Sequence, residues 1–531
     1  MGVDTLLTLT LAGGVVAALL LGFPVAFTLG GGALLAACLG ATLGVFDLAL
    51  LGALPSRLFG AVLWNEVLAA IPLFIVMGLM LERSRLAEDL LQAIDALIGR
   101  APGGLALGVT LVGMLLAAST GVVGASIATL GLLALPTLLQ RGYAPSFACG
   151  TVAAAGTLGQ IIPPSIVLVI LGDQLTAAWT RAQREIGVLA PEPMSVGDLF
   201  AGALLPGLLL VALYLLFQFV YARLRPQVAP DGTDARARPP APWELLRALV
   251  PTAGLILAVL GAILAGLATP TEAAALGAAG ATLLAGARVD WERRAPARLI
   301  GIGVLGLIAA LALEAAFDLR LGREDPPIAD QVAIWGAAAA CLAVALGLGD
   351  AVRRLHRAGV LTAVNRETLD LVAMIFTILI GASVFSLVFR GLGGEELVAD
   401  ALHSAPGGVW GATALVLGVM IALGFFLDFV EICFVVVPIA APMLLANDVV
   451  SPIWLGVMMA VALQSSFLTP PFGFALFYLR GVAPEEVATA AIHRGALPYV
   501  ALQIAALGVL ALAPPLATWL PARLFGGDFP M

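Results

Sequence analysis

Two short stretches rich in polar residues, glycine and proline interrupt long apolar runs of the chain. Residues 156–165 read GTLGQIIPPS inside the apolar run 145–172, and residues 464–473 read QSSFLTPPFG inside the run 452–478. Glycine weakens a helix, and proline removes a hydrogen-bond donor and clashes with the preceding turn. Each run is therefore predicted to be two half-helices joined by unwound backbone.

In unwound backbone of this kind, carbonyl oxygens are not used in helical hydrogen bonds and can bind ligands. At membrane depth it is tolerated only where it is buried in protein or lines a wet cavity. Hard cations take oxygen ligands, and hydroxyl groups can supply more of them. A pair of broken helices in corresponding places of two halves is the strongest sequence pointer to the central site of a transporter.

Two further apolar runs, 104–139 and 409–446, are interrupted near their middles, by Thr120-Gly121 and by Asp428. We interpret both as re-entrant hairpins. The tip of the first reads STGVVGAS over residues 119–126. Its hydroxyls could simply join helices, which is common in membranes. However, we expect the whole tip to face Thr157 and Gly159, and we predict that the tip and these two residues together form a cation site.

The second hairpin carries two carboxylates, Asp428 and Glu431. Carboxylates within an apolar run are expensive and usually functional, although the tip could instead reach water, where either acid would simply be solvated. A spacing of three residues puts both on one helix face, where a bound cation would hold both ionised. Glu272, which follows Thr269 and Pro270, is read instead as part of a helix cap.

The composition is that of a polytopic membrane protein. The 531 residues are 61% hydrophobic and 11% charged, with a mean hydropathy of +1.06. Soluble domains carry about 25% charged residues, and no polar stretch here is long enough for a soluble domain. The net charge of −8 argues against a nucleic-acid partner. The four cysteines lie singly in apolar runs, so neither a disulfide nor a metal site is expected. No catalytic motif for ATP hydrolysis or metal chemistry occurs, and we expect no enzyme.

The topology follows from the apolar runs and the arginines. Twelve spans are predicted, at 4–22, 25–44, 66–82, 145–172, 199–221, 245–267, 272–287, 298–318, 330–349, 368–389, 452–478 and 495–514. With both hairpins counted, the arginine clusters in 83–100, 223–247, 288–298 and 353–366 fall on one face, which is cytoplasmic by the positive-inside rule. Both termini are then outside. Residues 173–198 are expected to form an outer loop, and residues 81–98 an amphipathic segment at the cytoplasmic surface.

An internal repeat supports the same organisation. The sequence APGG at residues 101–104 recurs at 405–408, an offset of 304, and Pro163-Pro164 recurs as Pro470-Pro471, an offset of 307. The predicted fold is an all-α inverted repeat with two hairpins and two broken helices, working as an elevator. The expected division is 1–65 (scaffold spans), 66–221 (first repeat), 222–290 (linker and scaffold spans), 291–360 (inserted pair of spans), 361–520 (second repeat) and 521–531 (tail).

At these residues the chain resembles the large membrane subunit of tripartite ATP-independent periplasmic (TRAP) transporters. The resemblance rests on RGY at 141–143, on 156–165, on TPTEAAA at 269–275, on FLD at 426–428 and on LTPP at 468–471, and it is expected to exclude about 290–360. Residues 466–482 resemble the branch labelled mannitol/chloroaromatic. The chain departs from the family where Val122 and Val123 replace two serines of the first tip, and where residues 429–431 replace Thr-Thr-Pro.

The resemblance implies a sodium-driven importer of a small organic acid in the bacterial inner membrane, with sodium as coupling ion and no cofactor. Its partners would be a periplasmic substrate-binding protein, a small four-helix membrane subunit and lipid. A stand-alone dicarboxylate symporter is the alternative within transport. An intramembrane enzyme using the two carboxylates lacks a nucleophile. The expected sodium ligands are Thr120, Gly121, Ser126, Thr157, Gly159, Asp428, Ser465 and Thr469. The expected substrate contacts are Ser119, Gly156, Pro163, Pro164, Glu431, Gln464, Ser466, Pro470 and Pro471.

Overall fold

The computed structural model describes residues 2–84, 86–98, 101–120, 123–229, 242–289, 297–323, 327–447, 449–471 and 473–526. All regular structure in these ranges is helical. Eight described helices are long and apolar enough to cross a membrane. They are α1 (Val3–Leu20), α2 (Val25–Thr42), α7 (Val123–Gln140), α10 (Val196–Leu224), α13 (Arg298–Ala316), α14 (Ile328–Arg357), α15 (Val360–Gly391) and α21 (Thr489–Leu512). The protein is therefore an all-helical, polytopic membrane protein.

Shorter helices complete the first half of the chain. They are η1 (Leu48–Ala53), α3 (Leu54–Arg57), η2 (Leu58–Leu63), α4 (Ala70–Arg83), α5 (Leu86–Ile98), α6 (Gly104–Thr120), α8 (Pro145–Thr157), η3 (Leu158–Gln160) and α9 (Ile166–Glu185). The predicted span 66–82 corresponds to α4, which has 14 residues. The predicted surface segment 81–98 is divided, because its first residues finish α4 and the rest form α5.

The remaining shorter helices lie in the rest of the chain, from residue 242 onward. They are α11 (Pro242–Leu264), α12 (Pro270–Val289), α16 (Gly394–His403), α17 (Gly408–Leu423), α18 (Phe429–Leu445), α19 (Pro452–Leu468), α20 (Phe474–Val482) and α22 (Pro515–Phe525). The segment expected as a tail, 521–531, thus begins inside α22. That helix packs against α10, where a Cβ on Gly202 would lie 2.9 Å from the carbonyl oxygen of Ala517.

Some helices extend beyond their predicted spans. Around the arginine-rich segment 353–366, α14 continues to Arg357 and α15 begins at Val360, and Gly359 makes the tight turn between them with φ 77°. A left-handed glycine closes the end of a helix, here with the Gly359 N–H bonded to the carbonyl of His356. In the expected outer loop 173–198, α9 continues to Glu185. Leu175, Trp179 and Ala182 are buried along one face of this extension, and that packing keeps it helical.

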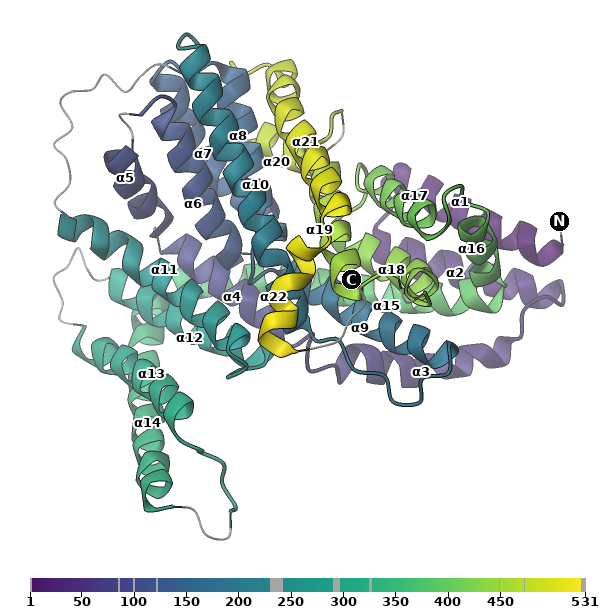
Figure 1. The fold of residues 1–531 in the computed structure, drawn as a ribbon, viewed down its shortest axis with the longest axis horizontal. Coiled ribbons are helices and arrows are strands. Elements are labelled where there is room, and N and C mark those ends of the chain that lie inside the picture. The colour runs from purple at the N-terminus through teal and green to yellow at the C-terminus, as the bar shows by residue number, and fades with distance from the viewer. Residues whose placement is uncertain are drawn as a thin grey trace.

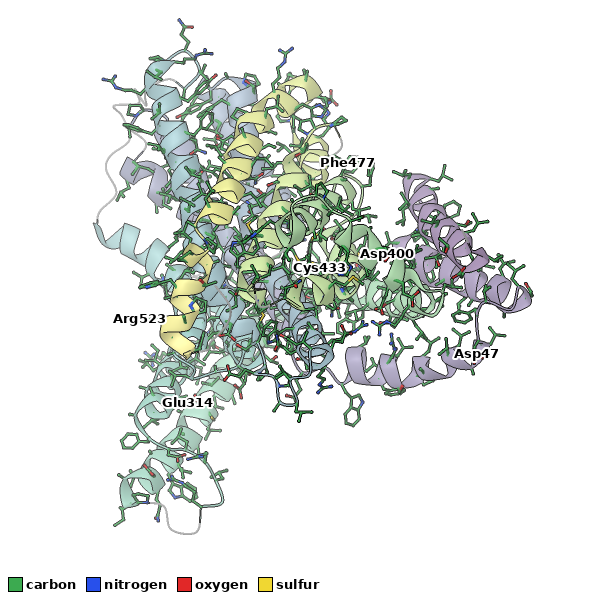
Figure 2. The ribbon with its side chains drawn as sticks, turned by 45° about the vertical axis from the view of Figure 1, so that its right-hand side comes forward. Asp47, Glu314, Asp400, Cys433, Phe477 and Arg523 are labelled. Carbon is green, nitrogen blue, oxygen red and sulfur yellow. The ribbon has the colours of Figure 1, made fainter. Side chains whose placement is uncertain are left out.

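Helices from the two halves pack against one another in matching pairs. Helix α2 packs on α15 and α12 packs on α4; α9 packs on α18 and α20 on α7; α8 packs on α21 and α19 on α10. Figure 1 shows α6, α7, α8 and α10 side by side, with α1, α2 and α16 at the other end of the molecule. The two broken segments lie between these groups, where the labelled Cys433 is also found (Figure 2).

Helices α13 and α14 form a hairpin that projects from the rest of the molecule (Figure 1). They approach closely at glycines: a Cβ on Gly303 would lie 2.9 Å from the Cα of Gly347. Only 17% of the apolar window of each helix is buried. Glu314 marks this projecting pair in Figure 2. A small cluster of Leu283, Ile300 and Ala351 anchors the pair, and Leu355 near the end of α14 belongs to the main core.

Candidate functional site

The first break lies between α8 and α9. Helix α8 ends at Thr157, η3 covers Leu158–Gln160, and the chain leaves helical geometry over residues 161–164 before α9 begins at Ile166. The Ser165 hydroxyl donates to the carbonyl oxygen of Gln160 at 3.0 Å and accepts from the N–H of Leu168 at 3.5 Å, which caps α9. The peptide bond between Pro163 and Pro164 is cis. Every residue from Gly156 to Ser165, including Gly159, is buried.

The second break lies between α19 and α20. Helix α19 ends at Leu468, and the Pro470–Pro471 peptide bond is also cis. The hydroxyls of this segment donate to carbonyls of their own chain: Ser465 to Val461 at 2.8 Å, Ser466 to Leu463 at 2.6 Å, and Thr469 to Ser465 at 2.7 Å. Unlike the first break, this one opens toward the surface, because Thr469 and Pro470 are half-buried and Pro471 is exposed.

The two breaks meet at Thr157 and Gln464. The Gln464 Nε2 donates to the Thr157 Oγ1 at 3.4 Å, and both side chains are fully buried. The offset between them, 464 − 157 = 307, equals the offset of the proline pairs, 470 − 163 = 307. Residues in corresponding positions of the two halves therefore contact each other directly.

Each predicted hairpin packs closely on the break of its own half. A Cβ on Gly156 would lie 3.2 Å from the backbone nitrogen of Ile127 in α7. A Cβ on Gly424, at the end of α17, would lie 2.0 Å from the Ser466 Oγ. Glycine is needed at both places because no side-chain atom fits between hairpin and break. Ser126 is buried in the first turn of α7.

Part of the first hairpin tip lies beyond what the structure describes. Ser119 and Thr120 are the last two residues of α6, but their side chains are not among the described ones, and Gly121 and Val122 lie outside the described ranges. Their predicted roles as ligands or substrate contacts therefore rest on the sequence.

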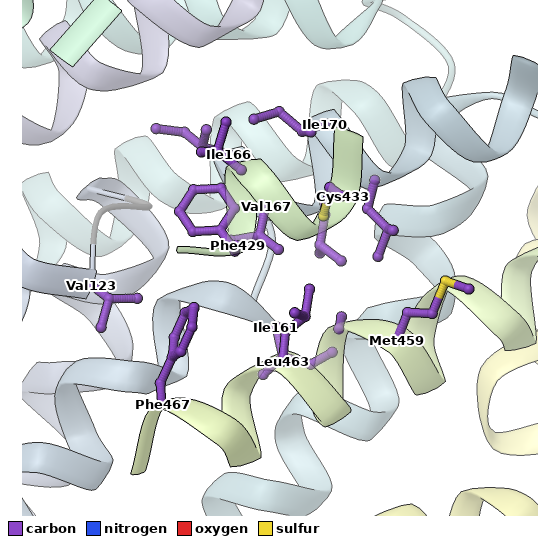
Figure 3. Close-up of a cluster of buried hydrophobic side chains, with 14 of the residues drawn as sticks. Val123, Ile161, Ile166, Val167, Ile170, Phe429, Cys433, Met459, Leu463 and Phe467 are labelled. Atoms are coloured by element: carbon purple, nitrogen blue, oxygen red, sulfur yellow. The ribbon is translucent and has the colours of Figure 1, made fainter. Parts of the chain in front are cut away.

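The half-helix after each break crosses to the hairpin of the other half. Figure 3 shows Ile166 and Ile170 of α9 beside Phe429 and Cys433 of α18. In the reciprocal contact, α20 lies on α7, where a Cβ on Gly124 would meet the Tyr478 ring at 2.9 Å. The half-helices α9 and α20 each contact the hairpin of the other half, so the two halves do not pack as independent units.

Asp428 and Glu431 form the N-terminal cap of α18. The Asp428 carboxylate accepts from the N–H of Phe429 at 2.7 Å, and the N–H of Asp428 donates to the Glu431 carboxylate at 3.0 Å. The backbone of Glu431 also donates to the Asp428 side chain, and this bond and the one from the Asp428 N–H to Glu431 together form a capping box. The capping box explains the spacing of three residues between Asp428 and Glu431 by helix structure alone, whereas the sequence analysis explained it by a shared cation. Among the described side chains, neither carboxylate bonds to Ser465 or Thr469.

The same device is present at Glu272, as predicted. Its carboxylate accepts from the N–H of Thr269 at 2.8 Å and from the Thr269 hydroxyl at 2.9 Å. Glu272 is exposed at the start of α12, whereas Glu431 is 6% exposed. The exposed cap at Glu272 is therefore purely structural, whereas the buried cap at Asp428 and Glu431 places charge beside the second break.

Among the described residues, three glutamines leave buried amide atoms without a hydrogen-bond partner, and two of them lie in the breaks. The atoms in the breaks are both polar atoms of the Gln160 side chain and the Oε1 of Gln464; the third is the Oε1 of Gln503 in α21. A buried amide without a partner is costly, and such groups are usually found where a water, an ion or a ligand satisfies them. Gln160 was not among the expected sodium ligands or substrate contacts, although its position in the first break is a sequence signal that could have identified it.

The breaks and the second hairpin carry several oxygen donors. The described residues hold no cluster of three or more Asp, Glu, His or Cys side chains. They do provide the hydroxyls of Thr157, Ser465 and Thr469, the Asp428 carboxylate, and carbonyls of unwound backbone. All of these are oxygen donors of the kind that hard cations prefer.

A conserved-family profile, "Tripartite ATP-independent periplasmic transporter, DctM component", matches residues 12–312 and 327–516. It therefore includes much of the segment 291–360, which was expected to fall outside the resemblance. The C4-dicarboxylate TRAP transporter large permease proteins DctM of Vibrio cholerae and Pseudomonas aeruginosa are 26% and 28% identical to this chain. The first match covers 90% of each chain and the second covers 86% of each.

Other similarities fit the same group. The isethionate TRAP transporter permease protein DctMQ of Oleidesulfovibrio alaskensis is 26% identical over 84% of this chain and 56% of its own length. The solved structure of the Alcanivorax borkumensis YdaH transporter has a TM-score of 0.51 and 18% identity, and covers 91% of this chain and 90% of that one. It shares the fold. On the profile match over nearly its whole length, this chain belongs to the DctM component family of tripartite ATP-independent periplasmic transporters.

Proposed function

We propose that this chain is the permease of a sodium-coupled importer that takes up a small organic acid by alternating access. The observation that carries the proposal is the contact between Thr157 and Gln464, which joins the two helix breaks at corresponding positions. An inverted repeat of this kind places substrate and ion sites at the interface of the repeats, near the middle of the membrane. The matching helix pairs of the two halves support the repeat.

Two sodium sites follow from the oxygen inventory. The first uses Thr120, Ser126 and Thr157 with carbonyls near Gly121 and Gly159. The second uses Asp428, Ser465 and Thr469 with nearby carbonyls. Between them the substrate contacts Ser119, Gly156, Pro163, Pro164, Glu431, Gln464, Ser466, Pro470 and Pro471. Both amide atoms of Gln160 and the Oε1 of Gln464 have no partner among the described residues. The Gln160 Nε2 suits the carboxylate of an organic acid, and the two amide oxygens suit a hydroxyl.

The substrate class rests on the names of relatives. They include permeases for C4-dicarboxylates, isethionate, ectoine and sialic acid, all of them small polar solutes. The resemblance of residues 466–482 to the mannitol/chloroaromatic branch is a further proposal. We infer a periplasmic binding protein and a small four-helix membrane subunit as partners, and the name DctMQ of one relative supports the second.

The proposed orientation in the bacterial inner membrane has both termini in the periplasm. Cysteines placed at Gly232 and Arg354 are expected to react with a membrane-impermeant reagent only from the cytoplasm, and one at Glu192 only from outside. Cys38 and Cys341 are exposed and must first be replaced. Labelling of Gly232 and Glu192 from one side would contradict the inverted repeat.

The transport proposal is tested in proteoliposomes that contain this chain and its small subunit. Uptake is measured with the cognate binding protein under an inward sodium gradient, a proton gradient, or neither. We expect uptake only with both sodium and the binding protein. Uptake without the binding protein would instead favour the stand-alone dicarboxylate symporter, and uptake driven by protons without sodium would overturn the choice of ion.

A further inference from the structure

Three helices meet where the projecting pair α13–α14 joins the rest of the molecule. A Cβ on Gly286 of α12 would lie 2.6 Å from the Cβ of Ala351 in α14. A Cβ on Gly347 of α14 would lie 3.0 Å from the carbonyl oxygen of Leu299 in α13. Ile300 of α13 shares a buried cluster with Ala351. The end of α12, the start of α13 and the last turns of α14 therefore lie together, and we call this place the hairpin base (Figure 1).

Each of the three helices brings arginine to the hairpin base. The arginines within two turns of the contacts are Arg288 of α12, Arg298 of α13, and Arg353, Arg354 and Arg357 of α14. The Arg354 side chain is paired with Asp350 at 2.9 Å. Arg298, Arg353 and Arg357 are exposed and have no ion-pair partner among the described residues. Residues 290–296 contain two acidic and two basic residues, so they leave the formal charge of this region positive.

The opposite end of the pair has its arginines neutralised. Arg320 pairs with Asp318 at 2.6 Å, and Arg323 pairs with Asp330 at 2.9 Å and with Asp318 at 3.5 Å. Both ends of the pair thus carry arginine, but in the part of the chain that the structure describes only the base leaves exposed arginines without an acidic partner. The excess positive charge is a property of the hairpin base and not of the whole pair.

Exposed apolar side chains follow directly on these arginines. They are Leu299, Ile302 and Leu305 of α13 and Leu346 of α14. Since only 17% of the apolar window of each helix is buried, the lipid bilayer surrounds most of both helices. A positive region that continues into an exposed apolar surface is complementary to a molecule with an anionic headgroup and hydrocarbon chains.

We propose that the hairpin base is a binding site for an anionic glycerophospholipid. The lipid phosphate contacts Arg353 and Arg357, which are one turn apart on α14, and Arg298 adds charge from α13. Guanidinium groups match phosphate because they donate two hydrogen bonds from one plane, and basic pockets between transmembrane helices bind anionic headgroups. The acyl chains lie along the exposed leucines and isoleucine of the pair. The site requires neither the coupling ion nor the substrate of the proposed function.

The test measures lipid binding to the purified full chain. Phosphatidylglycerol and, separately, the zwitterionic phosphatidylcholine are titrated in detergent, and bound lipids are counted by native mass spectrometry. We expect tighter binding of phosphatidylglycerol. The double variant Arg353→Gln with Arg357→Gln should weaken that binding about 25-fold, because each arginine near an anionic lipid contributes roughly 5-fold. Binding of phosphatidylcholine should not change. A variant that binds phosphatidylglycerol as well as the parent would overturn the proposal.

The matched control removes the same charge elsewhere. Arg223→Gln with Arg225→Gln changes two exposed arginines at the end of α10, on the same side of the membrane in the proposed orientation. Its affinity for phosphatidylglycerol should equal that of the parent. Equal weakening by the two glutamine pairs would indicate general surface attraction and would overturn the site. Arg353→Lys with Arg357→Lys keeps the charge and should retain most of the affinity.

Thermal stability distinguishes a lipid site from a structural role. Without added lipid, the Arg353→Gln, Arg357→Gln variant and the parent should melt at the same temperature, and phosphatidylglycerol should stabilise only the parent. A variant that melts earlier without lipid but is stabilised equally by it would overturn the proposal. Inorganic phosphate at the same concentration should have no effect, and stabilisation equal to that by phosphatidylglycerol would reduce the site to one for a free anion. If the double variant does not fold, Arg298→Gln should still weaken lipid binding about 5-fold.

Discussion

The two helix breaks share a sequence pattern but occupy different environments. The first is buried throughout, and its Thr157 hydroxyl is bonded to Gln464 from the other half of the chain. The second opens toward the surface at Pro471, and its hydroxyls bond carbonyls of their own segment. Its charge comes from a neighbouring hairpin, where Asp428 caps α18.

The half-helices that follow the breaks differ as well. Helix α9 has 20 residues and α20 has nine. The far end of α9 is tied to the second half by Arg181, which makes hydrogen bonds of 2.7 and 2.9 Å to the Glu395 carboxylate. The comparison shows that neutral dipoles surround the buried first break, whereas the second break is partly exposed and its hairpin carries a carboxylate cap.

The largest effect is expected from removing the charge beside the second break. Asn also caps helices, so Asp428→Asn should keep the start of α18. A hydrogen bond to a charged group contributes about 1.5–3 kcal/mol, which corresponds to a rise of roughly tenfold or more in the half-maximal sodium concentration. Thr157→Val should raise it less, because charge-assisted contacts are about twice as strong as neutral ones.

The matched control is Glu272→Gln, which changes a carboxylate in a similar cap that is exposed and distant in sequence from both breaks. Its sodium titration should equal that of the parent. A titration unchanged by Asp428→Asn would mean that the second site depends on Glu431 or on carbonyls alone, and the contrast between charged and neutral breaks would fail.

The next effect concerns the contact between the second hairpin and its break. Gly424→Ala places a methyl group 2.0 Å from the Ser466 Oγ and 2.6 Å from its Cβ, and overpacking of this kind costs about 1–3 kcal/mol. We expect a lower melting temperature and slower uptake. Gly418→Ala in the same helix meets nothing within 4 Å and should be neutral in both measurements. Equal behaviour of the two variants would contradict close docking.

A smaller effect on transport is expected from removing α13 and α14. The pair projects from the molecule, and only 17% of each apolar window is buried (Figure 1). Replacing residues 298–357 with a short linker should leave some sodium-driven uptake, because α13 and α14 pack mainly on each other, on α12 and on α15. Uptake is compared after membrane insertion and monodispersity have been checked. Complete loss in a folded variant would assign the pair a direct part in transport.

The smallest effect is expected at the ion pairs that tie α9 to α16. Burial raises the pKa of Glu395, but hydrogen bonds and charges from Arg181 and Arg390 outweigh it, so its pKa lies below the ordinary 4.5. The carboxylate therefore stabilises the fold above about pH 4.5, and this contribution is lost as the pH falls through the lowered pKa. Glu395→Gln should destabilise by about 1 kcal/mol or less at neutral pH, given the partial exposure.

The difference between Glu395→Gln and the parent should disappear in acid, when melting temperatures are followed as a function of pH. Glu396→Gln, at the neighbouring position of the same helix, serves as the control and should match the parent at every pH. A pH-independent loss for Glu395→Gln would show that packing, and not charge, ties the two halves at this point.

Sequence reasoning succeeded where a single residue type limits the backbone. Both broken segments leave helical geometry around their proline pairs, and Glu272 caps its helix as expected. It was less successful for the lengths of helices. In the predicted outer loop 173–198, α9 continues to Glu185. The spans predicted at 330–349 and 368–389 belong to longer helices that are separated only by the turn at Gly359.

The candidate site was only partly accessible to the same reasoning. Gln160 was missed, and so were the buried hydrogen bonds of Gln218 to Tyr499 and of Gln503 to Tyr214, although the tyrosine–glutamine spacing repeats at 214–218 and 499–503. This signal is weak by itself, since two residues four apart recur by chance in any long sequence. It becomes meaningful only when the two helices are known to face each other.

The sequence alone determined that the chain is helical and spans a membrane, because apolar length and scarce charge allow no other structure. It also determined where two helices break, because glycine and proline act on their own backbone. Only the tertiary structure decided which residues meet across the breaks: Thr157 with Gln464, and Tyr214 with Gln503. Such contacts join residues about 290 to 310 positions apart, and no local preference of the chain encodes them.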